Sequence, residues 1–202
     1  MFETTSFVAV SEDELVRSSD SATSRGRLLE AELPDQSDRD QILGLLDTHG
    51  DELADRSTLP GHLTGSALVV DAAGERALLM LHAKLGRWLQ PGGHADGDHD
   101  LARVALREAT EETGIEGLSV LVPAIDVDIH RIPERGSEPS HLHLDLRFVV
   151  VAPPEAQARG NSESEALRWV SWQELDDLSD EESLKRLARR GSEAYRRFLS
   201  QG

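Results

Sequence analysis

The sequence of 202 residues contains no cysteine, which excludes disulfides, thiolate zinc sites and iron–sulfur clusters. Basic residues are also scarce: 21 Lys and Arg stand against 38 Asp and Glu, giving a formal net charge of −17. Phosphate contacts along a nucleic acid need clustered Lys and Arg, so this charge argues against an extended nucleic-acid-binding surface. An anionic small molecule would need cations supplied locally.

Long apolar runs are missing as well. No run approaches the length that crosses a membrane, and the N-terminus lacks a basic region followed by an apolar one. We therefore expect a cytoplasmic protein without membrane association. The length suits one domain, which we place over residues 37–202. Residues 1–36 form a polar extension that is either partly disordered or an added strand or helix.

The most informative stretch is a glycine-rich segment followed by a helix. The pair Gly92-Gly93 follows a proline and predicts a loop in which backbone approaches a ligand closely. Asp98 or Asp100 can cap the helix that follows. Gly114 stands where a left-handed residue ends a helix, so we expect the helix to stop there.

Three carboxylates on this predicted helix, those of Glu108, Glu111 and Glu112, fall within an arc of roughly 100°. Such a run is often a solvated helix face. Here the arc continues an apolar stripe that is expected to turn inward, and like charges so close together repel one another. A hard divalent cation removes that repulsion, so we predict a Mg²⁺ or Mn²⁺ site, with Arg107 holding the carboxylates in orientation.

This stretch resembles the signature of the Nudix hydrolases, G-x5-E-x7-R-E-U-x-E-E-x-G-U, in which U is a bulky aliphatic residue. The residues that match at the family's spacing are Gly93, Arg107, Glu108, Glu111, Glu112, Gly114 and Ile115. His99 stands where the family has its first glutamate, and Ala109 is smaller than the usual aliphatic residue. Asp98 and Asp100 flank His99 and are candidates to replace the missing carboxylate.

The resemblance implies an α/β fold, the Nudix α/β/α sandwich with a mixed central sheet. It also implies hydrolysis of a pyrophosphate bond in a nucleoside diphosphate linked to another group. The metal ligands would be Glu108, Glu111, Glu112 and the backbone carbonyl of Gly92, with Glu112 the first choice for an indispensable one. The expected partner is a small nucleotide rather than a nucleic acid polymer, and relatives are often homodimers.

Nudix relatives often draw a further catalytic glutamate from a loop before the last strand. Glu163 and Glu165 are the candidates here, with Glu165 our choice for a catalytic role and Glu138 in an earlier loop as a rival. The segment 82–93 resembles the approach to the signature in a Nudix subgroup of unsettled substrate. In it, Lys84 and Arg87 either contact substrate phosphates, together with Gly93, or are surface charges.

A strand beginning at residue 141 alternates between two kinds of side chain. Its polar positions are His141, His143, Asp145 and Arg147. Two interpretations stay open: a solvated sheet face, or the lining of a substrate cleft. The His-x-His-x-Asp spacing imitates a zinc site, but parallel side chains on one strand need a further ligand, so zinc is the less favoured reading.

Hydrophobic periodicity places the remaining elements. We expect a helix from residue 37, strands at 65–70, 76–82, 118–130 and 165–170, and a helix whose capping box begins at Ser171. A final amphipathic helix starts near residue 180, with Gly191 as a candidate bend.

Two other functions compete with the hydrolase. A regulator that binds a nucleotide without hydrolysing it is kept open by His99. An isopentenyl diphosphate isomerase has a related architecture, but that enzyme normally depends on a catalytic cysteine, which this chain lacks.

Overall fold

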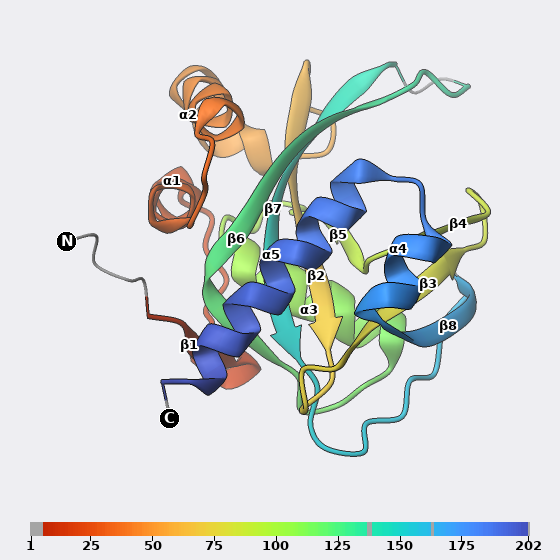
Figure 1. The fold of residues 1–202 in the computed structure, drawn as a ribbon. Helices are drawn as coiled ribbons and strands as arrows, with labels where there is room; N and C mark the ends of the chain where they lie inside the picture. The colour runs from red at the N-terminus through yellow and green to blue at the C-terminus, as the bar shows by residue number, and fades with distance from the viewer. Residues whose placement is uncertain (1–5, 137–138, 163, 202) are drawn as a thin grey trace.

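The protein is described by a computed structural model that covers residues 6–136, 139–162 and 164–201. Its centre is a mixed sheet with the strand order β1-β6-β7-β2-β3-β4, in which β5 also pairs with β2 and β8 with β3 (Figure 1). The strands are β1 (Val8–Ser11), β2 (Gly61–Val70), β3 (Arg76–His82), β4 (Arg87–Leu89), β5 (Gly92–His94), β6 (Ser119–Ile132), β7 (His141–Val151) and β8 (Ser164–Ser171).

Helices cover both faces of the sheet, which confirms the predicted α/β fold with a mixed central sheet. Figure 1 shows α5 lying across one face and α3 behind the opposite face. Leucines of α1, α2 and α3 are buried in one apolar core, and those of α4 and α5 in the other. The helices are α1 (Ser21–Glu30), α2 (Ser37–His49), α3 (Leu101–Thr113), α4 (Trp172–Leu178) and α5 (Glu182–Leu199), with short 3-10 turns at Glu12–Glu14 and Gly50–Ala54.

Strand β2 organises the sheet because its two edges have different partners. One edge pairs in parallel with β7 along its whole length, from Gly61 beside Leu142 to Val70 beside Val151. The other edge is divided between β5, which pairs at residues 64–66, and β3, which pairs at residues 69–70. The sheet therefore splits beside β2, and the split brings β5 next to α3.

Several local predictions are confirmed. Helix α3 ends at Gly114, whose φ of 63° is the left-handed conformation expected of the C-cap. The capping box of α4 forms, with the Ser171 hydroxyl accepting a hydrogen bond from the Glu174 N–H. At the other end of α3, neither predicted aspartate acts as a side-chain cap, because Asp98 and Asp100 are held by arginines instead.

The glycine pair was predicted as a loop, and that prediction is wrong. Gly92–His94 is strand β5, paired antiparallel with β2. A Cβ on Gly92 would lie 2.3 Å from the Ser66 hydroxyl oxygen, and one on Gly93 would lie 2.6 Å from the Glu108 carboxylate. The glycines thus allow the close approach that we predicted, but they do so within a strand.

Gly191, a candidate bend in the sequence, does not interrupt the last helix. Helix α5 is continuous through this position. A Cβ on Gly191 would lie 2.2 Å from Leu68 Cδ2 on β2. The residue therefore serves close packing of α5 against the sheet.

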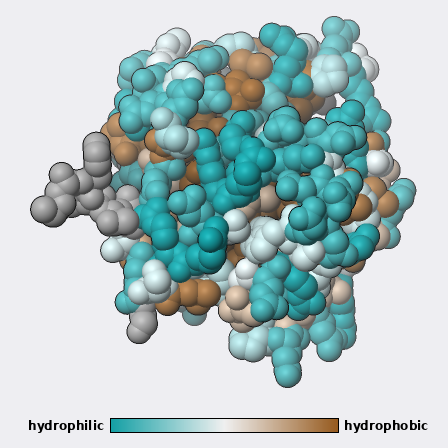
Figure 2. All heavy atoms as spheres, in the orientation of Figure 1, coloured by the Kyte–Doolittle hydropathy of each residue, from teal (hydrophilic) through white to brown (hydrophobic). Residues whose placement is uncertain are grey.

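The described part of the N-terminal extension has regular structure. β1 pairs antiparallel with β6, from Val8 beside Val122 to Ser11 beside Ser119. Leu28 of α1 is fully buried in the core that contains α3. The face that carries α5 is mostly hydrophilic, with scattered hydrophobic residues (Figure 2). None of the helices in the described ranges has the length and apolarity needed to cross a membrane.

Candidate active site

A cleft of about 710 Å³ lies where β2, β5 and β7 meet the C-terminal half of α3. Among the predicted catalytic, metal-binding and substrate-binding residues, six line it: Lys84, Arg87, Gly92, Gly93, Glu108 and Glu112. The volume lies within the range of small-molecule sites. A smaller cavity of about 290 Å³, between the N-terminal extension and α5, is lined by none of the site residues that we predicted.

Two of the carboxylates that line the cleft, those of Glu108 and Glu112, stand one turn apart on α3 and face β5. Glu112 is 4% exposed, and its Oε2 accepts a hydrogen bond of 3.0 Å from the Gly92 N–H. Glu108 sits against the Cα of Gly93, in the space that any larger residue there would fill. The apolar stripe of α3 does turn inward, as the sequence predicted, and carries these two side chains with it.

Arg107 holds this arrangement from the side. Its Nη2 donates to Glu108 Oε1 over 2.6 Å and to the backbone carbonyl of His94 over 2.9 Å. One guanidinium thus ties the helix carboxylate to the end of β5. This is the orienting contact expected of that position.

The other predicted carboxylates lie elsewhere. Glu111 is exposed, as is Glu165 near the start of β8, and neither lines the cleft. Glu163 and Glu138, the alternative loop glutamates, fall outside the described residues. The predicted carboxylate cluster is therefore divided by the structure, with Glu108 and Glu112 inside the cleft and Glu111 on the exposed side of the helix.

Three of the four polar positions of β7, namely His143, Asp145 and Arg147, line the cleft. Of the two interpretations left open by the sequence, the cleft lining is correct and the solvated sheet face is wrong. Asp145 and Arg147 are 1% and 3% exposed. The Asp145 carboxylate accepts hydrogen bonds of 2.8 to 2.9 Å from the hydroxyls of Thr64 and Ser66 on the neighbouring strand. Arg147 donates to Asp145 Oδ2 over 2.7 Å. The buried carboxylate of Asp145 and the buried guanidinium of Arg147 thus have partners, which allows this part of the face to lie under α5.

An ion-pair network extends this face to α5. Arg147 contacts Asp126 and Asp128 of β6, and Arg186 of α5 contacts the same two carboxylates. Burial raises the pKa of Asp128, but hydrogen bonds and charges from its partners, His130 and the two arginines, outweigh that effect. The pKa of this carboxyl is therefore held well below its ordinary value.

Histidines gather at one end of the cleft. His62 and His94 are separated by 5.1 Å between ring centroids, and His143 lies 5.1 Å from each of them. The sequence singled out His143, but the other two stand far from it along the chain. No short-range pattern joins them; only the pairing of β2 with β5 and β7 does.

Comparison with known proteins agrees with this geometry. The model of the NUDIX domain matches residues 62–197. The chain belongs to the Nudix family. The match begins within β2 and ends within α5, so it spans the whole cleft-forming part of the sheet. No curated protein matches the chain as a sequence.

Solved Nudix structures share the fold at low sequence identity. The E. coli dihydroneopterin triphosphate pyrophosphohydrolase is 16% identical, with a TM-score of 0.52 over 63% of this chain and 92% of that one. The Nudix hydrolase RenU from M. smegmatis is 21% identical, with a TM-score of 0.50 over 67% of this chain and 86% of that one. These likenesses support the Nudix fold.

The departure from the Nudix signature at His99 has a structural explanation. This residue is 1% exposed and lies away from the cleft lining. Its Nε2 donates to the Asp51 carbonyl over 3.0 Å, and its Nδ1 lies 2.8 Å from the Ser24 hydroxyl of α1. The histidine therefore joins the signature loop to the N-terminal extension.

The flanking aspartates are engaged in the same way. Asp100 pairs with Arg27 of α1, and Asp98 pairs with Arg103 while accepting a hydrogen bond from the Ser18 N–H. Neither lines the cleft. These contacts hold the extension, so the aspartates do not stand in for the missing glutamate in the cleft.

Proposed function

We propose that this protein hydrolyses a pyrophosphate bond in a nucleoside diphosphate linked to another group, in a reaction that depends on Mg²⁺ or Mn²⁺. The observation that carries the proposal is the placement of Glu108 and Glu112 of the Nudix helix against the glycine strand β5, inside a cleft of small-molecule size. Regulation by nucleotide binding alone is the alternative. The sequence kept that alternative open because His99 replaces a glutamate of the Nudix signature, but His99 lies outside the cleft.

The donors in this part of the cleft suit a hard divalent cation. Glu108 and Glu112 provide carboxylate oxygens, and the Gly92 carbonyl is the proposed backbone ligand. When bound, Mg²⁺ offsets the negative charge of a pyrophosphate and lowers the pKa of a coordinated water. Glu111 can join this set only if its exposed side chain turns toward the cleft, so we assign it a supporting role.

The remaining proposed roles concern the substrate and the base. Lys84 and Arg87 line the cleft on the side of β3 and β4, where their charges can face substrate phosphates. Arg87 is 68% exposed and already pairs with Glu181. For the general base we keep Glu165, because the adjacent Ser164 pairs with His82, a residue of the cleft lining.

The decisive experiment is a hydrolysis assay with Mg²⁺ and a panel of nucleotide sugars, dinucleoside polyphosphates, nucleotide cofactors, oxidised nucleotides and capped RNA. We expect wild type to release a nucleoside monophosphate from at least one small nucleotide. Glu112→Gln should lower kcat by at least about 100-fold, since it removes a charged ligand while leaving the fold intact. Glu116→Gln, an exposed position just beyond α3, is the matched control and should keep full activity.

Two further variants separate the roles. Glu111→Gln should lose less activity than Glu112→Gln, because its carboxylate lies outside the cleft. Glu165→Gln should lower kcat with little effect on KM if that residue is the base. Tight nucleotide binding by wild type without turnover would contradict the hydrolase and support the regulator. Activity retained in Glu112→Gln would contradict the proposed metal site.

A further inference from the structure

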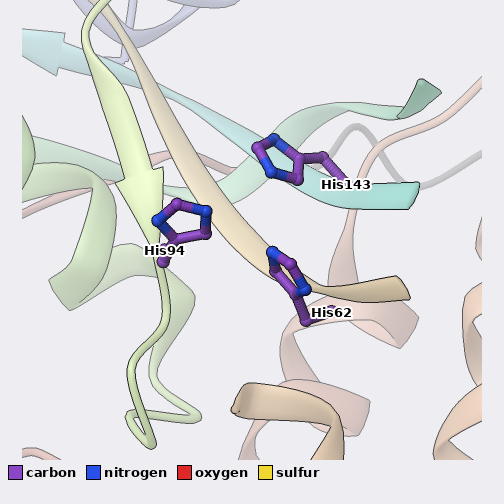
Figure 3. A group of neighbouring side chains, drawn as sticks. All are labelled: His62, His94 and His143. Carbon is purple, nitrogen blue, oxygen red and sulfur yellow. The ribbon is translucent and has the colours of Figure 1, made fainter. Parts of the chain in front are cut away.

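The three neighbouring histidines of the cleft come from three different strands. His62 of β2 and His143 of β7 are paired residues in the parallel ladder, so their side chains leave the sheet on the same face. His94 ends β5 and is the partner of Thr64 on β2. Figure 3 shows the three rings turned toward one another. One nitrogen from each ring lies within 4.8 Å of the other two.

The hydrogen bonding of His62 in this cluster differs from that of an ordinary buried polar side chain. His62 is 1% exposed, yet neither of its ring nitrogens makes a hydrogen bond of normal geometry within the described ranges, although a contact with the Thr58 backbone opposes the lowering of its pKa by burial. Buried polar atoms are nearly always paired with protein or water, so a ring whose two nitrogens both lack such a bond calls for an explanation. A metal ion among the rings would supply the missing partner.

We propose that His62, His94 and His143 bind one divalent transition-metal ion, with zinc as the first choice. Imidazole nitrogen suits zinc and related ions, whereas Mg²⁺ prefers carboxylate and other oxygen ligands. This site is therefore distinct in its chemistry from the carboxylates of α3, although His94 and His143 line the same cleft as Glu108 and Glu112. Three protein ligands leave the fourth tetrahedral position for a water or an oxygen of an anionic ligand.

The surroundings support the three ligands. His141 stacks on His62 at 4.8 Å between ring centroids, and its Nδ1 donates to the Pro139 carbonyl over 2.9 Å. His130 lies edge-on to His143 at 5.2 Å and pairs with Asp128. Metal–nitrogen bonds of about 2.0 Å put tetrahedral nitrogens about 3.3 Å apart, so the rings need only small rotations to close on the ion.

The pattern His-x-His-x-Asp imitates a zinc site in the sequence, where zinc was the less favoured reading because a further ligand was missing. Asp145 is committed to Thr64, Ser66 and Arg147, and His141 packs behind His62. Only His143 of that pattern belongs to the proposed set. The further ligands that a single strand lacks come from the neighbouring strands β2 and β5.

Direct metal binding tests this proposal. The full-length protein is stripped with a chelator, and Zn²⁺ is then titrated in competition with a chromophoric chelator. We expect one tightly bound zinc per chain. His62→Ala and His143→Ala should each weaken the binding by at least about 100-fold, because even residues behind metal ligands change affinity by 10- to 100-fold. His49→Ala, at the end of α2 and outside the cleft, is the matched control.

Controls keep this test separate from the hydrolase assay. Circular dichroism and thermal melts establish that each variant folds; if either fails to fold, His94→Asn on the short strand β5 replaces it. Glu112→Gln should bind zinc as wild type does, whatever its activity. Absence of stoichiometric zinc, or zinc binding unchanged in the histidine variants, would overturn the site without bearing on Mg²⁺-dependent hydrolysis.

A second measurement tests whether an anion can bind the metal at the fourth coordination position. Co²⁺ replaces zinc as a coloured probe, and inorganic pyrophosphate is added to the loaded protein. Direct ligation of a phosphate oxygen should change the visible absorption of Co²⁺, and the change should saturate. An unchanged spectrum, with pyrophosphate binding established by calorimetry, would show that the metal is closed to anions and would overturn this part of the proposal.

Discussion

His99 illustrates how a single residue can leave a family pattern for a structural reason. Its imidazole joins the loop before α3 to Ser24 and to the Asp51 carbonyl, and its backbone N–H donates to the Ser18 carbonyl. All three contacts lead to segments that precede β2. At this position the family's glutamate is replaced by a histidine, whose ring N–H can donate to a carbonyl. The function of His99 is therefore to hold the segments before β2 on the signature loop.

The consequence for stability can be measured. His99→Ala should lower the free energy of unfolding by about 1–3 kcal/mol, because it leaves buried polar partners unsatisfied. His99→Glu should be at least as harmful, since a buried carboxylate would face the Asp51 carbonyl. Urea unfolding gives both values, with His49→Ala as the control. Full stability of His99→Glu would contradict this role and favour a catalytic use of the position.

At the scale of elements, the packing of α3 on β2 determines where the carboxylates lie. Gly65 of β2 lies under the first turn of α3, where a Cβ would be 2.8 Å from the Leu101 carbonyl oxygen and 3.1 Å from the Ala105 nitrogen. Both atoms belong to the helix backbone and cannot swing aside. The helix approaches the sheet this closely only because the residue is glycine.

Replacing this glycine should therefore move the helix. Gly65→Ala is expected to lower the free energy of unfolding by about 1–3 kcal/mol through overpacking, and to reduce hydrolysis because Glu108 and Glu112 shift with α3. Gly44→Ala in α2 is the control: its Cβ would meet nothing within 4 Å, so it should stabilise the protein by up to about 1 kcal/mol. Denaturant unfolding of both variants measures these changes. An unchanged free energy of unfolding in Gly65→Ala would contradict the close-packing argument.

Elements with a strong hydrophobic periodicity, or with a residue that ends a helix, were predictable from the sequence. Helix α3, its stop at Gly114, and the alternation of β7 follow from local spacing. Strand β5 did not, because two glycines carry no strand propensity and the strand exists only through pairing with β2. The cluster of His62 with His143 was hidden for a similar reason, since a parallel pairing between distant segments has no short-range signature.

For the whole molecule, the network of Asp126, Asp128 and the arginines joins the sheet to α5. The pKa of Asp128 is lowered in the folded protein, so the unfolded chain binds a proton at higher pH than the folded one does. Its contribution to stability is full above the ordinary aspartate pKa of about 4 and is lost progressively as the pH falls below that value.

Arg186→Met tests this linkage. Removing the guanidinium should lower the free energy of unfolding at pH 7 by about 1–2 kcal/mol, a moderate loss because Arg186 is 33% exposed in its side chain and Asp126 keeps Arg147 and Arg190. Below pH 4 the difference from wild type should shrink. Unfolding in urea at pH 7, 5 and 3 measures it, with the exposed Arg189→Met as control. A difference that is constant across pH would contradict the assignment.

The strand β5 has three residues, and each one touches a different donor group. The Gly92 N–H meets Glu112, Gly93 makes room for Glu108, and His94 belongs to the imidazole trio. Because this one short strand contacts both proposed sets of donors, we expect an ion bound at one set to alter the fit of the other. Thermodynamic reciprocity then requires that magnesium change the affinity for zinc by the same factor as zinc changes that for magnesium.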